Sequence, residues 1–376
     1  MRVSIVGAGP AGCAAGARAA ELGARVRIYE EHEKIGEPVA CSAIVSRRGL
    51  EACGVPYEAI SFNRLKGAFI HMPDGLALRV KAGHDVANVF DRAKYDKLCA
   101  KRAEKAGAEI VVGKRCEAAD LRKLATASAL IGADGFSSST AKAFNFPSIH
   151  DYVVCYQEDL EGANFEDEES VHVFVSNALL PGFFAWAIPL GKGRARVGCG
   201  VRQGHNAKQA LDRLMAKEKS LREILDGASM LSRLGGVIPV HMRKQTAKGK
   251  VLLVGDAAGQ AKATTGGGIY FGSMCGRIAG EIAAQARGEK ELAAYEHGWR
   301  ALYSGDLARH RKIMDLAGRM GDRQLCMYAH LAKRLGIERF LSEHGDMDSP
   351  GVMLASLKKK KMLAGLFGMI FGRDNS

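Results

Sequence analysis

The sequence predicts an α/β protein. A Rossmann-like dinucleotide-binding domain, with a mixed or parallel sheet and helices, is interrupted by a β-rich α+β domain and followed by a helical C-terminal region. Three observations support this prediction. A glycine-rich turn joins a buried strand to a helix near the start, short strand-like runs dominate residues 151–201, and helical patterns fill the chain after residue 289.

The first thirty residues carry the most specific motif. Residues 2–6 predict a buried strand, residues 7–12 form a G-x-G-x-x-G turn, and a helix to about Leu22 precedes a second strand at 24–29 that ends at Glu30. In such a unit the glycines allow a tight turn and a close backbone approach, the helix N-terminus attracts phosphate, and the acid binds ribose hydroxyls. The motif therefore predicts a bound dinucleotide.

Shorter patterns predict the remaining elements. Strands are expected at 67–73, 76–81, 108–112, 129–132, 152–157, 171–175, 183–188, 195–201 and 250–254, and helices at 90–105, 207–225 and 269–287. Asp91 is placed to cap the helix at 90–105. The segment 158–169 holds seven acidic residues and predicts a solvated loop.

The sequence shows no long linker, so the domain boundaries are placed where the patterns change. The dinucleotide-binding domain is expected at 1–60, 85–150 and 245–290, the β-rich substrate domain at 61–84 and 151–244, and the helical region at 291–376. Four lysines at 358–361 precede an apolar run. Residues 357–372 are therefore a candidate membrane-surface helix or, alternatively, a helix docked on its own domain.

Charge and cysteine content narrow the function classes. Lysine and arginine number 54 against 41 acidic residues, a net charge of +13 that favours anionic lipid or an acidic protein partner, or serves only solubility. Nucleic acid is not expected, because no nucleic-acid-binding signature occurs. The nine cysteines form no Cys-x-x-Cys pair, which predicts no metal site and reduced thiols in a cytosolic protein. No run of 18 apolar residues occurs and no signal peptide is recognised, so no membrane span is expected.

Several segments together resemble the flavoprotein family built like p-hydroxybenzoate hydroxylase. Within it they resemble the archaeal geranylgeranyl reductases, which act on digeranylgeranylglycerophospholipids, over roughly residues 1–300. Beside the opening turn, Glu37–Ser42 is similar to the reductases' Pro-x-x-Cys segment, and Phe184–Gly191 is similar to their Tyr-x-Trp-x-Phe-Pro-x-Gly strand. Gly255-Asp256 and Lys262–Ile269 are similar to the family's flavin loop.

The resemblance implies FAD as the cofactor and a set of site residues. The implied cofactor-binding residues are Gly7, Gly9, Ala11, Gly12, Glu30, Cys41, Ser42, Arg92, Asp256, Gly267, Gly268 and Ile269. Cys41 is also the candidate catalytic residue or, alternatively, one small buried thiol among nine, and Arg92 is otherwise a surface residue at a helix start. Strand alternation places Phe184, Trp186 and Ile188 on one face, which is either the wall of an apolar slot for a prenyl tail or part of the sheet core.

The implied function is an FAD-dependent reductase that saturates isolated C=C bonds of geranylgeranyl chains of ether lipids, by hydride transfer from N5 of reduced FAD and protonation. The electron donor is left open between NAD(P)H and a ferredoxin-like carrier. A prenyl lipid substrate, an anionic membrane surface and an acidic electron-carrier protein are the expected partners. The expected location is cytoplasmic, on the inner face of the cell membrane. Two alternatives remain: a flavin monooxygenase or halogenase acting on an aromatic or polyketide, and a non-catalytic lipid carrier.

Overall fold

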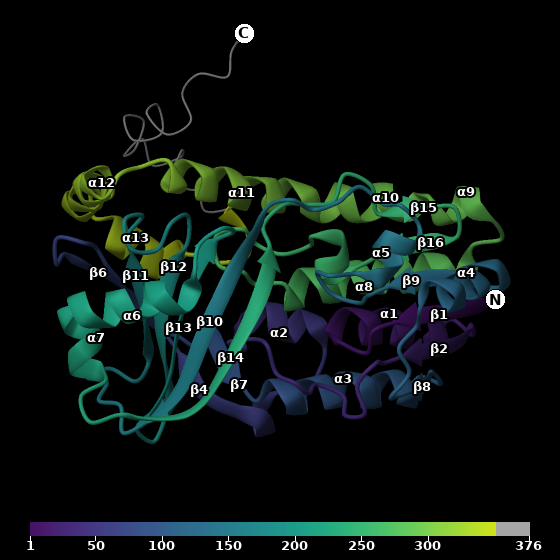
Figure 1. The fold of residues 1–376 in the computed structure, drawn as a ribbon, viewed down its shortest axis with the longest axis horizontal. Coiled ribbons are helices and arrows are strands. Elements are labelled where there is room, and N and C mark those ends of the chain that lie inside the picture. Colours follow the sequence, from purple (N-terminus) through teal and green to yellow (C-terminus); the bar gives the residue numbers. More distant parts are fainter. Residues whose placement is uncertain (351–376) are drawn as a thin grey trace, which may run out of the picture. The chain divides into compact units, whose positions relative to one another are not determined.

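The computed structural model describes residues 1–350, which divide into two compact units (Figure 1). Among the described residues, unit 1 comprises 1–62, 88–153 and 234–307, and unit 2 comprises 63–87, 154–233 and 308–350. The candidate membrane-surface helix at 357–372 lies outside the described residues. Within the described part, no helix is both long and apolar enough to cross a membrane.

Unit 1 is built on a six-stranded sheet in the order β15-β16-β9-β1-β2-β8. The strands are β1 (Arg2–Val6), β2 (Arg25–Tyr29), β8 (Glu109–Val111), β9 (Ala129–Gly132), β15 (Ala247–Lys248) and β16 (Val251–Leu253). All neighbouring pairs are parallel except β15 with β16. Since parallel strands end at the same edge of a sheet, the turn after β1, the end of β2 and the turn after β16 lie together there.

Two helices with many small residues pack face to face beside this sheet (Figure 1). They are α1 (Pro10–Glu21) and α8 (Ile269–Gln285). A Cβ atom built on Gly276 would lie 2.3 Å from the Ala11 carbonyl oxygen, and one on Gly280 would lie 2.1 Å from that of Ala15. Only glycine allows this approach of the two backbones, which joins the start of the chain to a segment more than 250 residues later.

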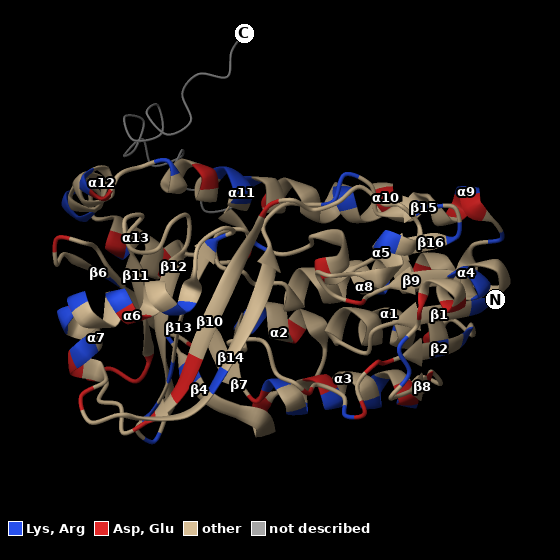
Figure 2. Cartoon of the chain, in the orientation of Figure 1, with Lys and Arg blue, Asp and Glu red and all other residues tan. Residues whose placement is uncertain are grey.

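Helix α3 (Arg92–Lys105) presents an apolar face to the core of unit 1 and a charged face outward, as Figure 2 shows. Tyr95, Cys99 and Ala103 are buried along the apolar face. Asp91 accepts a hydrogen bond from the Lys94 backbone N–H, so the predicted cap is confirmed. The residue before it, Phe90, belongs to a strand, so the helix begins two residues later than predicted.

The other elements of unit 1 surround these. They are β3 (Ile44–Ser46), α2 (Arg47–Cys53), η1 (Glu58–Ile60), β7 (Ala87–Phe90), α4 (Ala118–Ala127), α5 (Ser139–Ala143), η2 (Gly255–Ala258), α9 (Glu289–Leu292), α10 (Ala294–Trp299) and η3 (Arg300–Ser304). Strands β3 and β7 form a small sheet with β4 (Ser61–Leu65), which leads into unit 2.

Unit 2 is built on a seven-stranded sheet in the order β14-β10-β13-β12-β11-β5-β6. Its strands are β5 (Gly67–His71), β6 (Ala77–Lys81), β10 (Tyr152–Glu161), β11 (Ser170–Val175), β12 (Phe184–Gly191), β13 (Arg194–Arg202) and β14 (Ser229–Pro239). Strands β5 and β6 pair antiparallel around the turn that follows His71, as the sequence predicts.

Helices cover both faces of the unit 2 sheet. On one face, α6 (Ala207–Lys217) and α7 (Lys219–Ile224) pack through Leu211, Leu214 and Leu221 against the inward side chains of β12 and β13. On the other face, α12 (Asp322–Arg334) packs beside Met72 and Leu78. The remaining described helices of the C-terminal part are α11 (Gly305–Gly318) and α13 (Ile337–His344).

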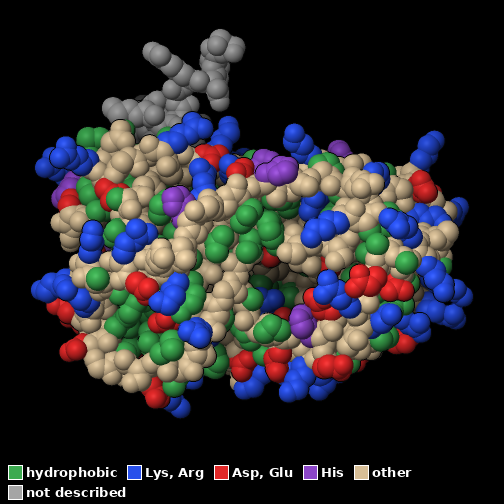
Figure 3. Space-filling view, in the orientation of Figure 1, with side chains coloured by type: hydrophobic (Ala, Val, Ile, Leu, Met, Phe, Trp, Pro, Cys, Tyr) green, Lys and Arg blue, Asp and Glu red, His purple; other side chains and the backbone are tan. Residues whose placement is uncertain are grey.

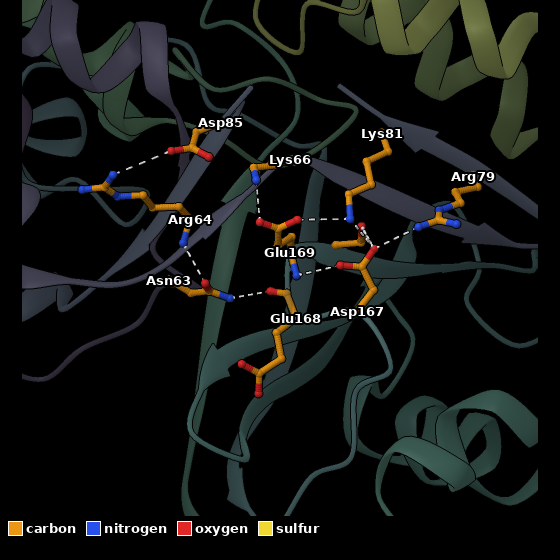
Figure 4. Close-up of polar contacts among 10 residues, drawn as sticks. Asn63, Arg64, Lys66, Arg79, Lys81, Asp85, Asp167, Glu168 and Glu169 are labelled. Carbon is orange, nitrogen blue, oxygen red and sulfur yellow. Dashed lines mark hydrogen bonds and ion pairs between the residues drawn. The ribbon is translucent and has the colours of Figure 1, made fainter. Parts of the chain in front are cut away.

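The predicted solvated loop at 158–169 is wrong for its first four residues, because β10 continues to Glu161. Farther along, Asp167 and Glu169 form ion pairs instead of facing only water. The Lys81 ammonium lies 2.7 Å from the Asp167 carboxylate and 3.2 Å from that of Glu169 (Figure 4). Burial raises the pKa of the Asp167 carboxyl, but the hydrogen bonds from Lys81 and its neighbours outweigh this and lower it.

The helical region expected at 291–376 does not form a unit of its own among the described residues. Helix α10 belongs to unit 1, where Tyr295 is fully buried and its hydroxyl donates to the Leu253 carbonyl at 2.8 Å. Helix α12 belongs to unit 2, where Leu325 and Ala329 are buried. The large apolar side chains of each helix complete the core of the unit to which it belongs.

Candidate functional site

The turn between β1 and α1 needs glycine at two positions and leaves open space at a third. Gly7 has φ +100°, and a Cβ on it would lie 2.3 Å from the Ala133 carbonyl oxygen. A Cβ on Gly12 would lie 2.0 Å from the Gly7 oxygen. A Cβ on Gly9, in contrast, would have no atom within 4 Å. Gly9 therefore faces a space that the described chain does not fill, directly before the first turn of α1.

That space belongs to a cavity of about 590 Å³ lined entirely by residues of unit 1. Five of the predicted cofactor-binding residues line it: Gly7, Gly9, Glu30, Arg92 and Asp256. The other seven do not line it: Ala11, Gly12, Cys41, Ser42, Gly267, Gly268 and Ile269. No side chain caps the first turn of α1 in the described chain, so its backbone N–H groups are available to an anion in the cavity.

Glu30 directly follows β2, and its carboxylate is fixed by three donors. The backbone N–H of Ala8 donates to it at 2.8 Å, the backbone N–H of His32 at 3.0 Å, and His32 Nδ1 lies at 2.7 Å. Only 13% of the side chain is exposed. The Ala8 bond ties the acid to the glycine turn, so both parts of the motif face the same cavity.

Arg92 stands at the start of α3 and is held by Asp96, one helical turn later. Its Nε donates to Asp96 Oδ1 at 2.7 Å and its Nη2 to Oδ2 at 3.2 Å. The guanidinium also hydrogen-bonds the Cys41 sulfur, which accepts from the Ala43 backbone N–H at 3.3 Å. Burial lowers the pKa of Arg92, but Asp96 and Cys41 outweigh it and raise this pKa well above its ordinary value.

Asp256 follows β16 and lies at the N-terminus of α8. A Cβ on Gly268, the residue before this helix, would lie 3.0 Å from Asp256 Oδ1, so a larger residue there would crowd the carboxylate. Burial raises the pKa of the Asp256 carboxyl, and the positive charge of Arg92 opposes this rise. The acid thus faces the cavity between a cation and the positive end of a helix dipole.

The loop between Asp256 and α8 is closed by backbone bonds across Lys262. The Lys262 N–H donates to the Gly267 carbonyl at 3.1 Å, and the Gly266 N–H donates to the Lys262 carbonyl at 2.8 Å. The buried Lys262 side chain passes so close that a Cβ on Gly267 would lie 2.6 Å from its Cε. The absence of a side chain at Gly267 therefore leaves the space that the Lys262 side chain occupies. Helix α8 begins two residues later, at Ile269.

In unit 2, the three predicted substrate residues occur along β12 and differ in exposure. Ile188 is 1% and Trp186 8% exposed, whereas Phe184 is half-buried. The rings of Phe184 and Trp186 meet edge to face with centroids 5.8 Å apart. The Trp186 indole N–H donates to Gln157 Oε1 of β10 at 3.2 Å.

Two residues near the predicted sites were not predicted from the sequence. Asp96 stands four residues after Arg92, and this helical spacing is a signal that would have found it. Gln157 lies on a neighbouring strand, and no sequence pattern links it to Trp186. Its Nε2 is buried without a hydrogen-bond partner among the described residues. Leaving a buried donor unpaired costs roughly 1–3 kcal/mol.

Comparison with known proteins places these features in a family. Residues 1–289 match the family model described as an FAD binding domain. A relative from Methanopyrus kandleri named digeranylgeranylglycerophospholipid reductase 2 is 32% identical, and the match covers 90% of this chain and 92% of the relative. The chain belongs to the digeranylgeranylglycerophospholipid reductase family. All residues that line the cavity lie within the span matched by the FAD binding domain model.

Solved structures agree with this family at the level of the fold. A geranylgeranyl bacteriochlorophyll reductase-like protein from Thermoplasma acidophilum has a TM-score of 0.80 at 22% identity, covering 98% of this chain and 99% of that protein. A flavin-dependent brominase has a TM-score of 0.66 at 12% identity, covering 96% of this chain and 99% of that protein. The predicted fold class is therefore confirmed, and the fold alone does not separate a reductase from a halogenase.

The residues of the reductase fit FAD. The open space before Gly9, the uncapped turn of α1 and the cation of Arg92 suit the diphosphate of a dinucleotide. Glu30 and Asp256 line the same cavity with carboxylate oxygens, which can accept hydrogen bonds from hydroxyl groups of such a ligand. The Asp256 backbone carbonyl accepts from the Gly259 N–H at 3.1 Å, but its carboxylate receives no hydrogen bond from the described residues, which leaves the carboxylate available to a ligand.

Proposed function

We propose that this protein is an FAD-dependent reductase that saturates isolated C=C bonds in the geranylgeranyl chains of ether lipids. The observation that carries the proposal is the cavity of unit 1, with Gly9, Glu30, Arg92 and Asp256 on its walls, in a chain 32% identical to a named reductase of such lipids. When bound and reduced, FAD supplies a hydride to one alkene carbon, while a proton must reach the other.

Residues of unit 1 would bind and orient this cofactor. The N-terminus of α1 and Arg92 would hold the diphosphate, and Glu30 would accept hydrogen bonds from the ribose hydroxyls. Asp256, at the start of α8, would hold hydroxyls of the linker. Arg92 would at the same time fix the Cys41 sulfur, which we propose to lie beside the reacting part of the cofactor.

Residues of unit 2 would provide a dry surface for the prenyl chain. Unactivated double bonds react only when they are closely aligned and shielded from water. The half-buried Phe184, which meets the Trp186 ring edge to face, suits an isoprenoid tail, whereas Ile188 is 1% exposed and buried in the sheet. We propose this face as the substrate surface.

The charge of the chain suits the surface on which such a substrate resides. The excess of 54 basic over 41 acidic residues favours an anionic membrane or an acidic electron carrier. Figure 3 shows basic side chains spread over the visible face with acidic ones among them, instead of one basic patch. The net charge of +13, and not a basic patch on this face, supports the peripheral membrane association that we propose.

The function is tested with dithionite-reduced holoenzyme under anaerobic conditions. Addition of a geranylgeranyl ether lipid should reoxidise the flavin, and mass spectrometry should show a gain of two hydrogens for each bond reduced. If the reduced enzyme instead ignores every prenyl lipid but consumes NAD(P)H and oxygen with an aromatic substrate, the halogenase or monooxygenase function is correct. Lipid binding by a colourless protein that takes up no FAD would indicate a carrier.

A further inference from the structure

Helix α12 turns its buried side chains and its acidic residue toward the rest of unit 2. Leu325 and Ala329 are 9% and 7% exposed and belong to the apolar cluster that the helix covers. The Asp322 carboxylate accepts hydrogen bonds from the Ser176 hydroxyl and the Asn177 backbone N–H, both at 2.7 Å. Asp322 is the only acid in the sequence of this helix, so the outward side of α12 carries no acid of its own.

The outward side of α12 combines apolar and basic side chains. Met327 is 56% and Leu331 is 36% exposed, and the two lie one helical turn apart. Arg323 stands one turn before Met327, Arg334 stands three residues after Leu331, and both arginines are exposed. With 3.6 residues per turn, these four side chains share the side of the helix opposite Leu325. We call these four residues the α12 outer face.

The positive charge of the α12 outer face is not neutralised within the part of the chain that the structure describes. Neither Arg323 nor Arg334 forms an ion pair with a residue of that part. Two acids beside the helix are already engaged. Asp74 Oδ2 lies 2.9 Å from His330 Nε2, and the Glu338 carboxylate of α13 accepts a hydrogen bond from a backbone N–H of β6 at 2.7 Å. The exposed guanidinium groups are therefore available to an anionic partner.

This combination of side chains matches an anionic lipid surface. Methionine and leucine enter the boundary between headgroups and acyl chains, while long arginine side chains keep their charge beside the phosphates. A second copy of the chain would bring like charges together, and so would the chain's own residues 351–376, which include five basic residues and one acid. A stable protein interface usually takes about 20–30 residues on each side, far more than the outer face of one helix supplies.

We propose that the α12 outer face docks the protein on an anionic lipid surface. The inference rests on the proposed function, because it assigns to one helix the peripheral membrane association proposed above. Met327 and Leu331 supply the apolar contact, and Arg323 and Arg334 contact lipid phosphates. The face takes no part in binding FAD or in the transfer of hydride or proton.

The test measures co-sedimentation of the FAD-loaded full chain with vesicles of phosphatidylcholine and phosphatidylglycerol. R323Q/R334Q should lower the partition coefficient about 25-fold, since each basic residue near an anionic membrane contributes about fivefold. M327S/L331S keeps both charges and should lower it about tenfold, because less apolar surface enters the lipid. Raising the salt concentration should weaken binding of the unchanged protein more than binding of R323Q/R334Q.

A matched control separates this face from net charge. Arg213 and Lys217 are exposed on α6, another helix of unit 2. R213Q/K217Q removes the same number of charges as R323Q/R334Q but should change the partition coefficient by no more than about twofold, because charges far from the lipid are screened by salt. If the two double variants weaken binding equally, only net charge matters and the inference is wrong.

A tryptophan on the α12 outer face reports what covers it. M327W adds an exposed indole to a chain whose Trp186 and Trp299 are buried. The added emission should shift to shorter wavelength on anionic vesicles and be quenched by lipids that carry bromine in their acyl chains. Short-wavelength emission without vesicles would mean that the chain itself or a second copy covers the face. An indole that stays exposed on vesicles would mean that another surface binds them. Either result overturns the inference.

Vesicle binding and turnover are separate readouts. With a geranylgeranyl ether lipid in detergent, R323Q/R334Q should keep the kcat and KM of the unchanged protein, because the α12 outer face lies outside the cofactor cavity. Loss of vesicle binding at unchanged turnover supports the inference. Vesicle binding requires no turnover, so a protein that binds vesicles through α12 but reduces no prenyl lipid refutes only the proposed function.

Discussion

Replacing Asp96 with Asn tests how firmly Arg92 is held at the cofactor cavity. The pair makes two hydrogen bonds, of 2.7 and 3.2 Å, and its side chains are 19% and 9% exposed. Removing one partner of a fully buried ion pair costs about 3–5 kcal/mol. Since Arg92 keeps some contact with water and Asn keeps one acceptor, we expect D96N to lower the free energy of unfolding by about 2–3 kcal/mol.

The assay is urea unfolding of the apoprotein, read from Trp299 fluorescence in a W186F background. Trp299 is fully buried in unit 1, so its emission reports on the unit that contains Asp96. D91N is the matched control on the same helix, because Asn caps a helix about as well as Asp. A D96N protein as stable as D91N, within about 0.5 kcal/mol, would refute the reasoning, since that spread is typical of surface changes.

Three further predictions follow from the geometry. G9A should leave apoprotein stability unchanged but weaken FAD binding at least tenfold by flavin fluorescence, whereas G12A should destabilise the apoprotein itself, because its Cβ meets a backbone oxygen at 2.0 Å. E30Q should weaken FAD binding about tenfold at unchanged fold by circular dichroism, the value of one charge-assisted hydrogen bond; equal affinity would remove Glu30 from the site. Burial and neighbouring His71 lower the pKa of His172 to about 4, against about 6.5 when unfolded, so stability should fall as pH drops from about 6.5 to about 4. H172N should flatten this dependence in pH-resolved urea unfolding, and an unchanged profile would contradict it.

The elements that the sequence predicts correctly are those whose signal lies within a few neighbouring residues. The turn at 7–12, the strands on either side of α1 and the cap at Asp91 all depend on residues close together in the chain, and each occurs where expected. The same holds for Glu30, which the glycine turn itself contacts through Ala8.

Other features depend on contacts between distant segments, which a single sequence does not encode locally. The acidic composition of residues 158–169 predicts a loop. The ion pairs of Asp167 and Glu169 with Lys81, which lies far earlier in the chain, could not be predicted from that composition. Gln157 is one of many polar residues in the predicted strands. Its hydrogen bond with Trp186 depends on how β10 and β12 are arranged in the sheet, which the sequence does not give. The sequence of the helices after residue 289 does not indicate to which of the two units each helix belongs.

The backbone approach of α1 to α8 has a consequence for biosynthesis. A ribosome releases α1 first, but Gly276 and Gly280, against which α1 packs, emerge only after the strand-rich segments of unit 2 up to residue 233 have been made. Nascent chains shorter than about 285 residues therefore expose the small-residue face of α1 to solvent and to chaperones. Because Asp256 is part of the cavity wall, we expect the cavity to be complete, and FAD to bind, only late in the synthesis of each molecule.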